Sequence, residues 1–311
     1  MYTHIGCEPL QTLDETQQAT LHAWLLYPTY DAPRLFSFDA YTLYLAIGAA
    51  PAADALPLVV ISHGTGSSPW TLRGLAAALV GAGYAVLLIE HPGNNSRENH
   101  LGHPAFPISA ALLQARPRHV RIARQAALAS RLGPHLCHER YAVIGHSLGG
   151  YTALALAGAR PMTLPPTIDP ATPPQELAKH AIAVSIEPDP AIAAALLLAP
   201  ALDFFGAPEA LAQVTLPLFV RTGGADPSCP TGKILSLLGG LPKGTVLDHD
   251  EIPDAGHFAF QSPFPAAKAN IPPAQDPLRF DRAGYQPHLQ RTVLTFLMQH
   301  FAAPAPVPSA I

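Results

Sequence analysis

Five short runs of consecutive apolar residues constrain the fold of this chain more than any other feature of its sequence. They cover residues 58–61, 84–89, 141–144, 194–198 and 216–220. A strand exposed on one face alternates apolar and polar residues, whereas a parallel strand covered on both faces is apolar throughout. The runs therefore predict a parallel sheet buried between two layers.

Helical patterns separate or follow these runs. They cover residues 71–82, 117–131, 151–160 and 288–301. Alternation of strands and helices predicts an α/β fold in which a doubly wound, mostly parallel sheet has helices on both faces. The earlier segment 19–27 is predicted to add an antiparallel edge strand, and one domain is expected over residues 1–302.

Proline marks the predicted loops, since it provides 35 of the 311 residues, about twice the usual share. It concentrates in residues 161–190, in 263–287 and in the last eight residues. Proline lacks a backbone donor and disrupts helix interiors, so these segments are predicted to be irregular. Residues 161–192 are either a lid or a passive crossover loop, and 303–311 are expected to be a disordered tail.

Charge and hydropathy exclude two classes of protein. Lysine and arginine number 18 against 22 acidic residues, without a basic run, which argues against a nucleic-acid partner. The apolar stretch 74–89 has 16 residues and three glycines, short of the roughly 20 that a transmembrane helix needs. The first twenty residues lack a basic start followed by an apolar run, so a cytoplasmic protein is expected.

Cysteine and histidine are the residue types that most often bind zinc. Cys7, Cys137 and Cys229 are odd in number and widely spaced, as expected of ordinary thiols. Six residues invite a metal interpretation: His91, His100, His103, His135, Cys137 and His138. No two of them sit four residues apart on a clear helix with a nearby carboxylate, so neither a metal nor another cofactor is expected.

The most specific motif is the pentapeptide 145–149, Gly-His-Ser-Leu-Gly. It follows the apolar run 141–144 directly and leads into the next helical segment. In this context the serine sits on a sharp strand-to-helix turn with its hydroxyl exposed. A serine hydroxyl needs a base, and the base needs an acid that holds its tautomer. Ser147 is therefore a candidate nucleophile.

The candidate base and acid follow Ser147 in the order serine, acid, histidine. Of the later histidines, only His257 lies in a turn that follows the expected strand around residue 246 and precedes the final helix, although a solvated loop histidine would look similar. Asp226 follows the run 216–220 in a turn rich in glycine and proline, and Asp203 follows the preceding run. We favour Asp226 as the acid and keep Asp203 as the alternative.

An oxyanion hole would need two backbone N–H groups. The residue after the nucleophile, Leu148, supplies one, and Thr65 in the loop after the run 58–61 is the candidate for the second. Five residues near the predicted strand ends are candidates for lining an apolar substrate pocket. They are His63, Trp70, His146, Phe204 and Phe258.

At these motifs the chain resembles the serine esterases of the α/β-hydrolase superfamily. More narrowly, it is similar to the predicted dienelactone hydrolases and the plasma-type platelet-activating-factor acetylhydrolases. The matching segments are 59–64, 90–93, 145–151, 199–202, 256–258 and 280–282. The resemblance implies acyl-ester hydrolysis through Ser147, with Thr65 and Leu148 as the oxyanion hole. True dienelactone hydrolases carry a cysteine nucleophile where this chain has Ser147.

Two functional hypotheses follow. The first is a serine carboxylesterase acting on a small-molecule ester: a soluble ester, a short-chain or oxidised phospholipid, or a synthetic polyester. The second is a non-catalytic α/β-hydrolase scaffold that binds a small ligand, because fold alone does not determine function. The scaffold would be expected to lose the serine, the base or the oxyanion glycines, and this chain keeps all three. The oligomeric state is not indicated.

Overall fold

A ten-stranded sheet forms the centre of the protein. The computed structural model describes residues 4–100, 108–164, 176 and 179–302. The strand order is β12-β11-β10-β7-β5-β6-β2-β1-β4-β3. The parallel strands are β5 (Leu56–Ser62), β6 (Ala85–Glu90), β7 (Leu136–His146), β10 (Ile192–Leu198), β11 (Leu218–Gly223) and β12 (Leu247–Ile252). Five of these strands contain the apolar runs, which confirms the predicted parallel sheet.

The N-terminal part of the sheet is antiparallel for the most part. Its strands are β1 (His4–Asp14), β2 (Ala19–Thr29), β3 (Arg34–Phe38) and β4 (Tyr41–Ile47). The prediction of an antiparallel strand at 19–27 is confirmed, but its place at the edge is wrong: β2 lies between β6 and β1. Because β1 also pairs with β4, the sheet continues to β3.

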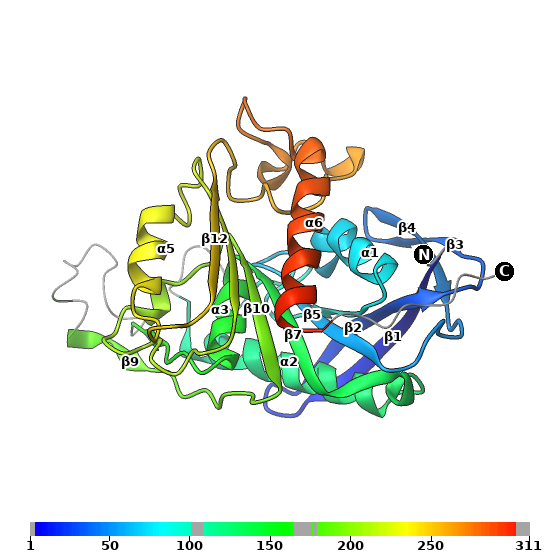
Figure 1. Ribbon diagram of the computed structural model, residues 1–311, viewed down its shortest axis with the longest axis horizontal. Coiled ribbons are helices and arrows are strands. Elements are labelled where there is room, and N and C mark those ends of the chain that lie inside the picture. Colours follow the sequence, from blue (N-terminus) through cyan, green and yellow to red (C-terminus); the bar gives the residue numbers. More distant parts are fainter. Residues whose placement is uncertain (1–3, 101–107, 165–175, 177–178, 303–311) are drawn as a thin grey trace.

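Two helical layers cover the sheet (Figure 1), as the sequence predicts. Side chains of a strand alternate between its faces, so Val59 and Ile61 pack on one side, whereas Leu58 and Val60 pack on the other. Helices α1 (Arg73–Gly81) and α6 (Arg282–His300) cover the first face. Helices α2 (Ala110–Ala129), α3 (Leu148–Leu156) and α5 (Thr231–Leu238) cover the second.

Three helices begin earlier than the sequence patterns predict. α2 begins at Ala110, where the Ser109 side chain accepts the Leu112 N–H, and Pro117 lies inside the helix. A proline at this position leaves the Leu113 carbonyl without its helical partner, and the Tyr151 hydroxyl donates to that carbonyl at 3.0 Å instead. Likewise α3 begins at Leu148, directly after Ser147. The Asp281 cap starts α6 at Arg282, with Pro287 inside it.

The proline-rich segments contain short elements where they are described. Within 161–192, β8 (Met162–Thr163) pairs with β9 (Ile182–Ala183), whereas 165–175 and 177–178 lie outside the described residues. The lid or crossover at 161–192 therefore stays a prediction. The predicted tail at 303–311 lies outside the described residues, and the single domain over 1–302 also stays a prediction. Single 3₁₀ turns are η1 (Pro69–Leu72), η2 (Gly133–His135), η3 (Asp203–Phe205), η4 (Ala266–Lys268) and η5 (Pro272–Ala274).

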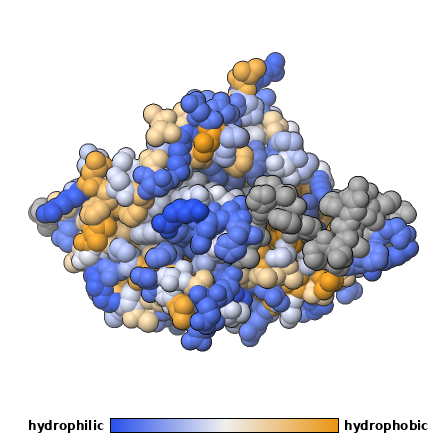
Figure 2. Space-filling model, turned by 180° about the vertical axis from the view of Figure 1, so that it is seen from behind, coloured by the Kyte–Doolittle hydropathy of each residue, from blue (hydrophilic) through white to orange (hydrophobic). Residues whose placement is uncertain are grey.

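The surface of the described residues carries both hydrophilic and hydrophobic side chains. On the face shown in Figure 2, hydrophilic and hydrophobic residues alternate in small groups. Among the described helices, none has both the length and the apolar character required to cross a bilayer.

Candidate active site

Ser147 occupies a strained turn between β7 and α3. Its φ of 54° and ψ of −118° lie in a region that residues other than glycine rarely adopt. Backbone hydrogen bonds hold this conformation. The Ser147 N–H donates to the Leu198 carbonyl at 3.0 Å, and the Ser147 carbonyl accepts from Gly150 and Ala201 at 2.8 and 3.0 Å. The end of β10 therefore supports the turn that presents the serine.

The glycines beside Ser147 are required by close packing of the backbone. A Cβ on Gly145 would lie 2.0 Å from the Gly149 carbonyl oxygen. A Cβ on Gly149 would lie 2.0 Å from the Ser62 carbonyl oxygen. Each distance is far below van der Waals contact, so neither position accepts a side chain without movement of the backbone.

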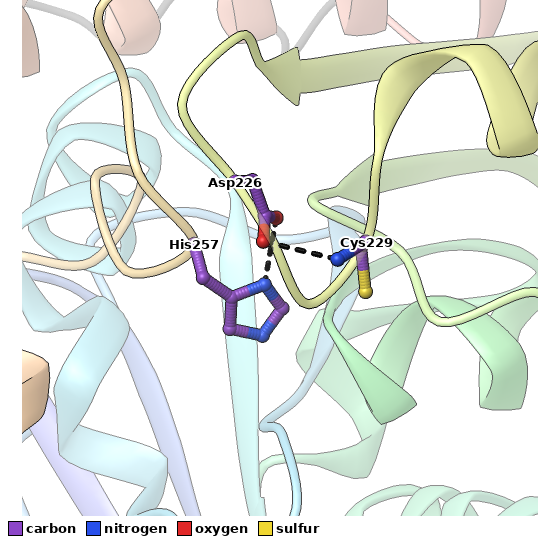
Figure 3. A group of neighbouring side chains, drawn as sticks. All are labelled: Asp226, Cys229 and His257. Carbon is purple, nitrogen blue, oxygen red and sulfur yellow. Dashed lines mark hydrogen bonds and ion pairs between the residues drawn. The ribbon is translucent and has the colours of Figure 1, made fainter.

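His257 and Asp226 form a hydrogen-bonded pair at the carboxyl ends of β11 and β12 (Figure 3). His257 Nδ1 donates to Asp226 Oδ2 at 2.8 Å. Asp226 Oδ1 accepts the backbone N–H groups of Ser228 and Cys229 at 2.8 and 3.0 Å. Burial raises the pKa of Asp226, but the bonds from His257 and the two backbone donors outweigh burial and lower it. The pair thus joins a carboxylate to an Nδ1 that carries a proton.

His257 lies beside the turn that carries Ser147. Its carbonyl accepts the Nε2–H of His146 at 2.9 Å, and the two rings are 5.1 Å apart between centroids. Within the described part of the chain, no hydrogen bond joins the Ser147 hydroxyl to His257. Such bonds are often long without substrate and tighten when substrate binds.

Asp203, the alternative acid, lies in η3 with a different partner. Its carboxylate pairs with Lys233 Nζ at 2.8 Å, and 58% of its side chain is exposed. The structure therefore brings Asp226, and not Asp203, into contact with His257.

The loop that carries Thr65 lies close to Ser147, and Leu148 follows Ser147 in the chain. A Cβ on Gly64 would lie 3.1 Å from Ser147 Cβ, so the loop after β5 runs against Ser147. Thr65 is exposed in this loop, and Gly66 follows with a φ of 59° that favours glycine. Leu148 begins α3, where a helix leaves its first N–H groups without an internal partner.

A buried arginine contacts the end of β5, and the sequence did not predict it. Arg116 of α2 is fully buried and donates to the His63 carbonyl, to Ser62 Oγ at 3.2 Å and to Asn94 Oδ1. It also donates to Thr152 Oγ1 of α3 at 3.1 Å. Burial lowers its pKa to about 9, so it stays charged at neutral pH. The sequence shows no signal for this role, because an arginine on a helix is usually solvated.

Two further histidines extend this network. His91 Nε2 lies 2.9 Å from Ser62 Oγ, and its Nδ1 lies 3.1 Å from His119 Nδ1. His119 Nε2 in turn lies 3.1 Å from Asp14 Oδ2. His91 is thus a buried member of a hydrogen-bonded chain, and His103 of the metal interpretation lies outside the described residues.

The five predicted pocket residues occupy different environments. His63 and His146 are buried and bonded to protein: His63 Nδ1 donates to the Gly64 carbonyl at 2.7 Å. Trp70 is 3% exposed and stacks on Phe38 at 4.2 Å between ring centroids. Phe204 packs edge-on against Tyr151, and Phe258 lies edge-on to His257. Of the five, Phe258 has direct contact with the His257 ring, as does His146, and lining of a pocket stays a prediction.

Lowering the pH from 7 to 5 is expected to reduce the free energy of unfolding. Burial lowers the pKa of His63 and His146 to about 3, from an ordinary value of 6.5. Below pH 6.5 the unfolded chain binds protons at both residues and the folded chain does not, so stability falls with pH. The loss is about 1.4 kcal/mol per pH unit for each histidine, or about 4 kcal/mol for both at pH 5.

Urea unfolding at pH 7, 6 and 5 measures this effect. His146→Gln is the matched control, because glutamine retains a donor but does not titrate, so the pH slope should fall by about 1.4 kcal/mol per pH unit. A wild-type stability that is constant between pH 7 and 5 would contradict the interpretation.

The arrangement defines a class of protein. A parallel sheet covered on both faces, a serine on a strained strand-to-helix turn, and a His–Asp pair at the strand ends are features of the α/β-hydrolase architecture. The chain matches the alpha/beta hydrolase family over residues 58–269 and belongs to that family. The resemblance seen in the sequence is confirmed at this level.

Similar solved structures span almost the whole chain. Ferulic acid esterase from Streptomyces cinnamoneus is 18% identical with a TM-score of 0.68, over 99% of this chain and 94% of that one. Esterase 2 from Thermogutta terrifontis, phosphorylated by paraoxon, is 17% identical with a TM-score of 0.57 over 96% of each chain. Dienelactone hydrolase from Anabaena variabilis is 19% identical with a TM-score of 0.52, over 94% and 98%. These likenesses show the fold. Among curated proteins, no sequence matches this chain.

Proposed function

We propose that the protein is a serine hydrolase that cleaves carboxylic esters through an acyl-enzyme intermediate. Ser147 is the nucleophile, His257 the general base and acid, and Asp226 the residue that orients and stabilises the imidazole. The observation that carries the proposal is the 2.8 Å bond from His257 Nδ1 to Asp226, beside the strained turn of Ser147. This bond leaves Nε2 with the lone pair that a base requires.

The reaction takes two steps. His257 Nε2 accepts the Ser147 proton as Oγ attacks the ester carbonyl, and the Thr65 and Leu148 N–H groups stabilise the resulting oxyanion. The imidazolium then donates its proton to the leaving alkoxide, and an acyl-enzyme forms. Water, deprotonated by His257, attacks the acyl carbonyl. His257 then returns this proton to Ser147 Oγ as the bond to the acyl group breaks, which releases the carboxylic acid and restores the enzyme. Asp226 stays ionised throughout and stabilises the imidazolium.

Two of the similar structures support the ester class. They are a ferulic acid esterase and an esterase phosphorylated by paraoxon. The proposed substrate is a small-molecule carboxylic ester. Its candidates are a soluble ester, a phospholipid and a polyester, which differ in the acyl group and the alcohol.

Hydrolysis of p-nitrophenyl acetate, followed by release of p-nitrophenolate, tests the proposal. Turnover is expected, and paraoxon should stop it by phosphorylating Ser147, because an activated serine oxygen attacks such an electrophile. Peptide mass spectrometry locates the label. A label on another serine would refute the assignment of Ser147. Absence of turnover over a range of acyl lengths, together with absence of a label, would favour the non-catalytic scaffold.

Chelation provides the control for this experiment. Prolonged treatment with EDTA is expected to leave the rate unchanged, because His257 and not a metal-bound water activates the nucleophile. A loss of activity that zinc restores would instead indicate a metal site formed by the histidine and cysteine candidates of the sequence.

A further inference from the structure

Cys229 lies beside the His257–Asp226 pair. One ligand atom from each of Asp226, Cys229 and His257 lies within 4.8 Å of the other two (Figure 3). Asp226 and Cys229 come from the loop between β11 and α5, and His257 comes from the loop after β12. Cys229 and Asp226 are buried, whereas His257 is partly exposed. Three side chains from two loops therefore converge on one small volume.

These three ligand types suit a thiophilic divalent cation. Zinc binds thiolate sulfur at about 2.3 Å and imidazole nitrogen or carboxylate oxygen at about 2.0–2.2 Å, in tetrahedral geometry. Neighbouring ligand atoms in such a site are about 3.3–3.8 Å apart. Ligand atoms within 4.8 Å of one another therefore need to approach by at most about 1.5 Å. His257 Nδ1 and Asp226 Oδ2, at 2.8 Å, would instead separate slightly to admit the ion. One thiolate and one carboxylate also neutralise a charge of +2. With three protein ligands, water would take the fourth position of the tetrahedron.

The carboxylate is already oriented for this role. Asp226 Oδ1 is held by the N–H groups of Ser228 and Cys229 at 2.8 and 3.0 Å. Oδ2 accepts only the His257 proton among the bonds of the described residues. An ion that replaces this proton keeps both backbone bonds, so binding does not require the loop to unfold.

We propose that Asp226, Cys229 and His257 form an inhibitory site for Zn²⁺ or Cd²⁺. The inhibitory effect rests on the proposed function, whereas the binding does not. On binding, the Cys229 thiol releases its proton to the solvent, and the ion forms bonds to Sγ, to Oδ2 and to one ring nitrogen. The His257–Asp226 hydrogen bond breaks.

Inhibition follows whichever ring nitrogen binds the ion. Coordination through Nε2 occupies the lone pair that would accept the Ser147 proton. Coordination through Nδ1 leaves the single proton of the neutral ring on Nε2, which is then a donor. In both cases His257 no longer serves as the base, so the site differs from a catalytic zinc centre, in which the metal activates water.

Cadmium binding tests the proposal without any measurement of activity. Cd²⁺ titrated into the protein is expected to produce the ultraviolet charge-transfer absorbance of a cadmium–thiolate bond, saturating at one equivalent. The absorbance should disappear in Cys229→Ser. It should persist in Cys137→Ser, the matched control, since Cys137 is partly exposed and lies outside the cluster.

Inhibition by Zn²⁺ forms the second readout. Zn²⁺ should inhibit ester hydrolysis by the wild type and by Cys137→Ser equally, and Cys229→Ser should need at least tenfold more Zn²⁺. Absence of the thiolate absorbance, or its persistence in Cys229→Ser, overturns the site. If Cd²⁺ binds as expected but the wild type hydrolyses no ester, the site stands and the proposed function fails.

Discussion

Ser147→Ala is expected to lower kcat for p-nitrophenyl acetate by about 10⁴-fold, because alanine has no oxygen to attack the ester carbonyl. The residual rate would come from substrate binding and from the oxyanion donors at Thr65 and Leu148. The free energy of unfolding should change little, since Ser147 makes its structural bonds through the backbone. Stopped-flow or steady-state rates, together with urea unfolding of the same samples, measure both quantities.

A double variant distinguishes a triad from independent residues. His257→Ala alone should reduce kcat to a level similar to that of Ser147→Ala. The two changes together should cost no more than either alone, because residues that act as a unit are not additive. Wild-type turnover in His257→Ala would move the base to another histidine, such as His180 or His249. Losses that multiply would mean that Ser147 and His257 act separately.

Asp226→Asn is expected to cost about 10³- to 10⁴-fold in kcat with little change in KM. An asparagine amide next to Nδ1 would donate rather than accept, which favours the tautomer with the proton on Nε2 and removes the base. The change retains the size of the side chain and the acceptor for the Ser228 and Cys229 N–H groups. Steady-state kinetics over a range of substrate concentrations separate kcat from KM.

Asp203→Asn is the matched control for this substitution. Asp203 is exposed and paired with Lys233, and an exposed ion pair contributes about 0–1 kcal/mol. Because His257 pairs with Asp226 and not with Asp203, the substitution should change kcat by less than about tenfold. A larger loss in Asp203→Asn than in Asp226→Asn would reverse the assignment of the acid.

The sequence predicted the centre of the fold because its signal is local. A strand buried on both faces needs consecutive apolar residues, so the runs at 58–61 and 141–144 identified β5 and β7 directly. The motif around Ser147 is equally local, since Gly145 and Gly149 are required by backbone atoms close to the turn. Helix ends were predicted less well. Pro117 suggested a start, but the distant Tyr151 hydroxyl satisfies the carbonyl that this proline leaves free.

Only the tertiary structure decided which groups meet. Asp226 and Asp203 both follow strands of the same kind, and the register of β11 and β12 brings Asp226 to His257 while η3 directs Asp203 to Lys233. The convergence of Cys229 on that pair has no sequence signature either. Local patterns determine strands and turns through the backbone, whereas contacts between side chains far apart in sequence depend on how the sheet and its loops pack.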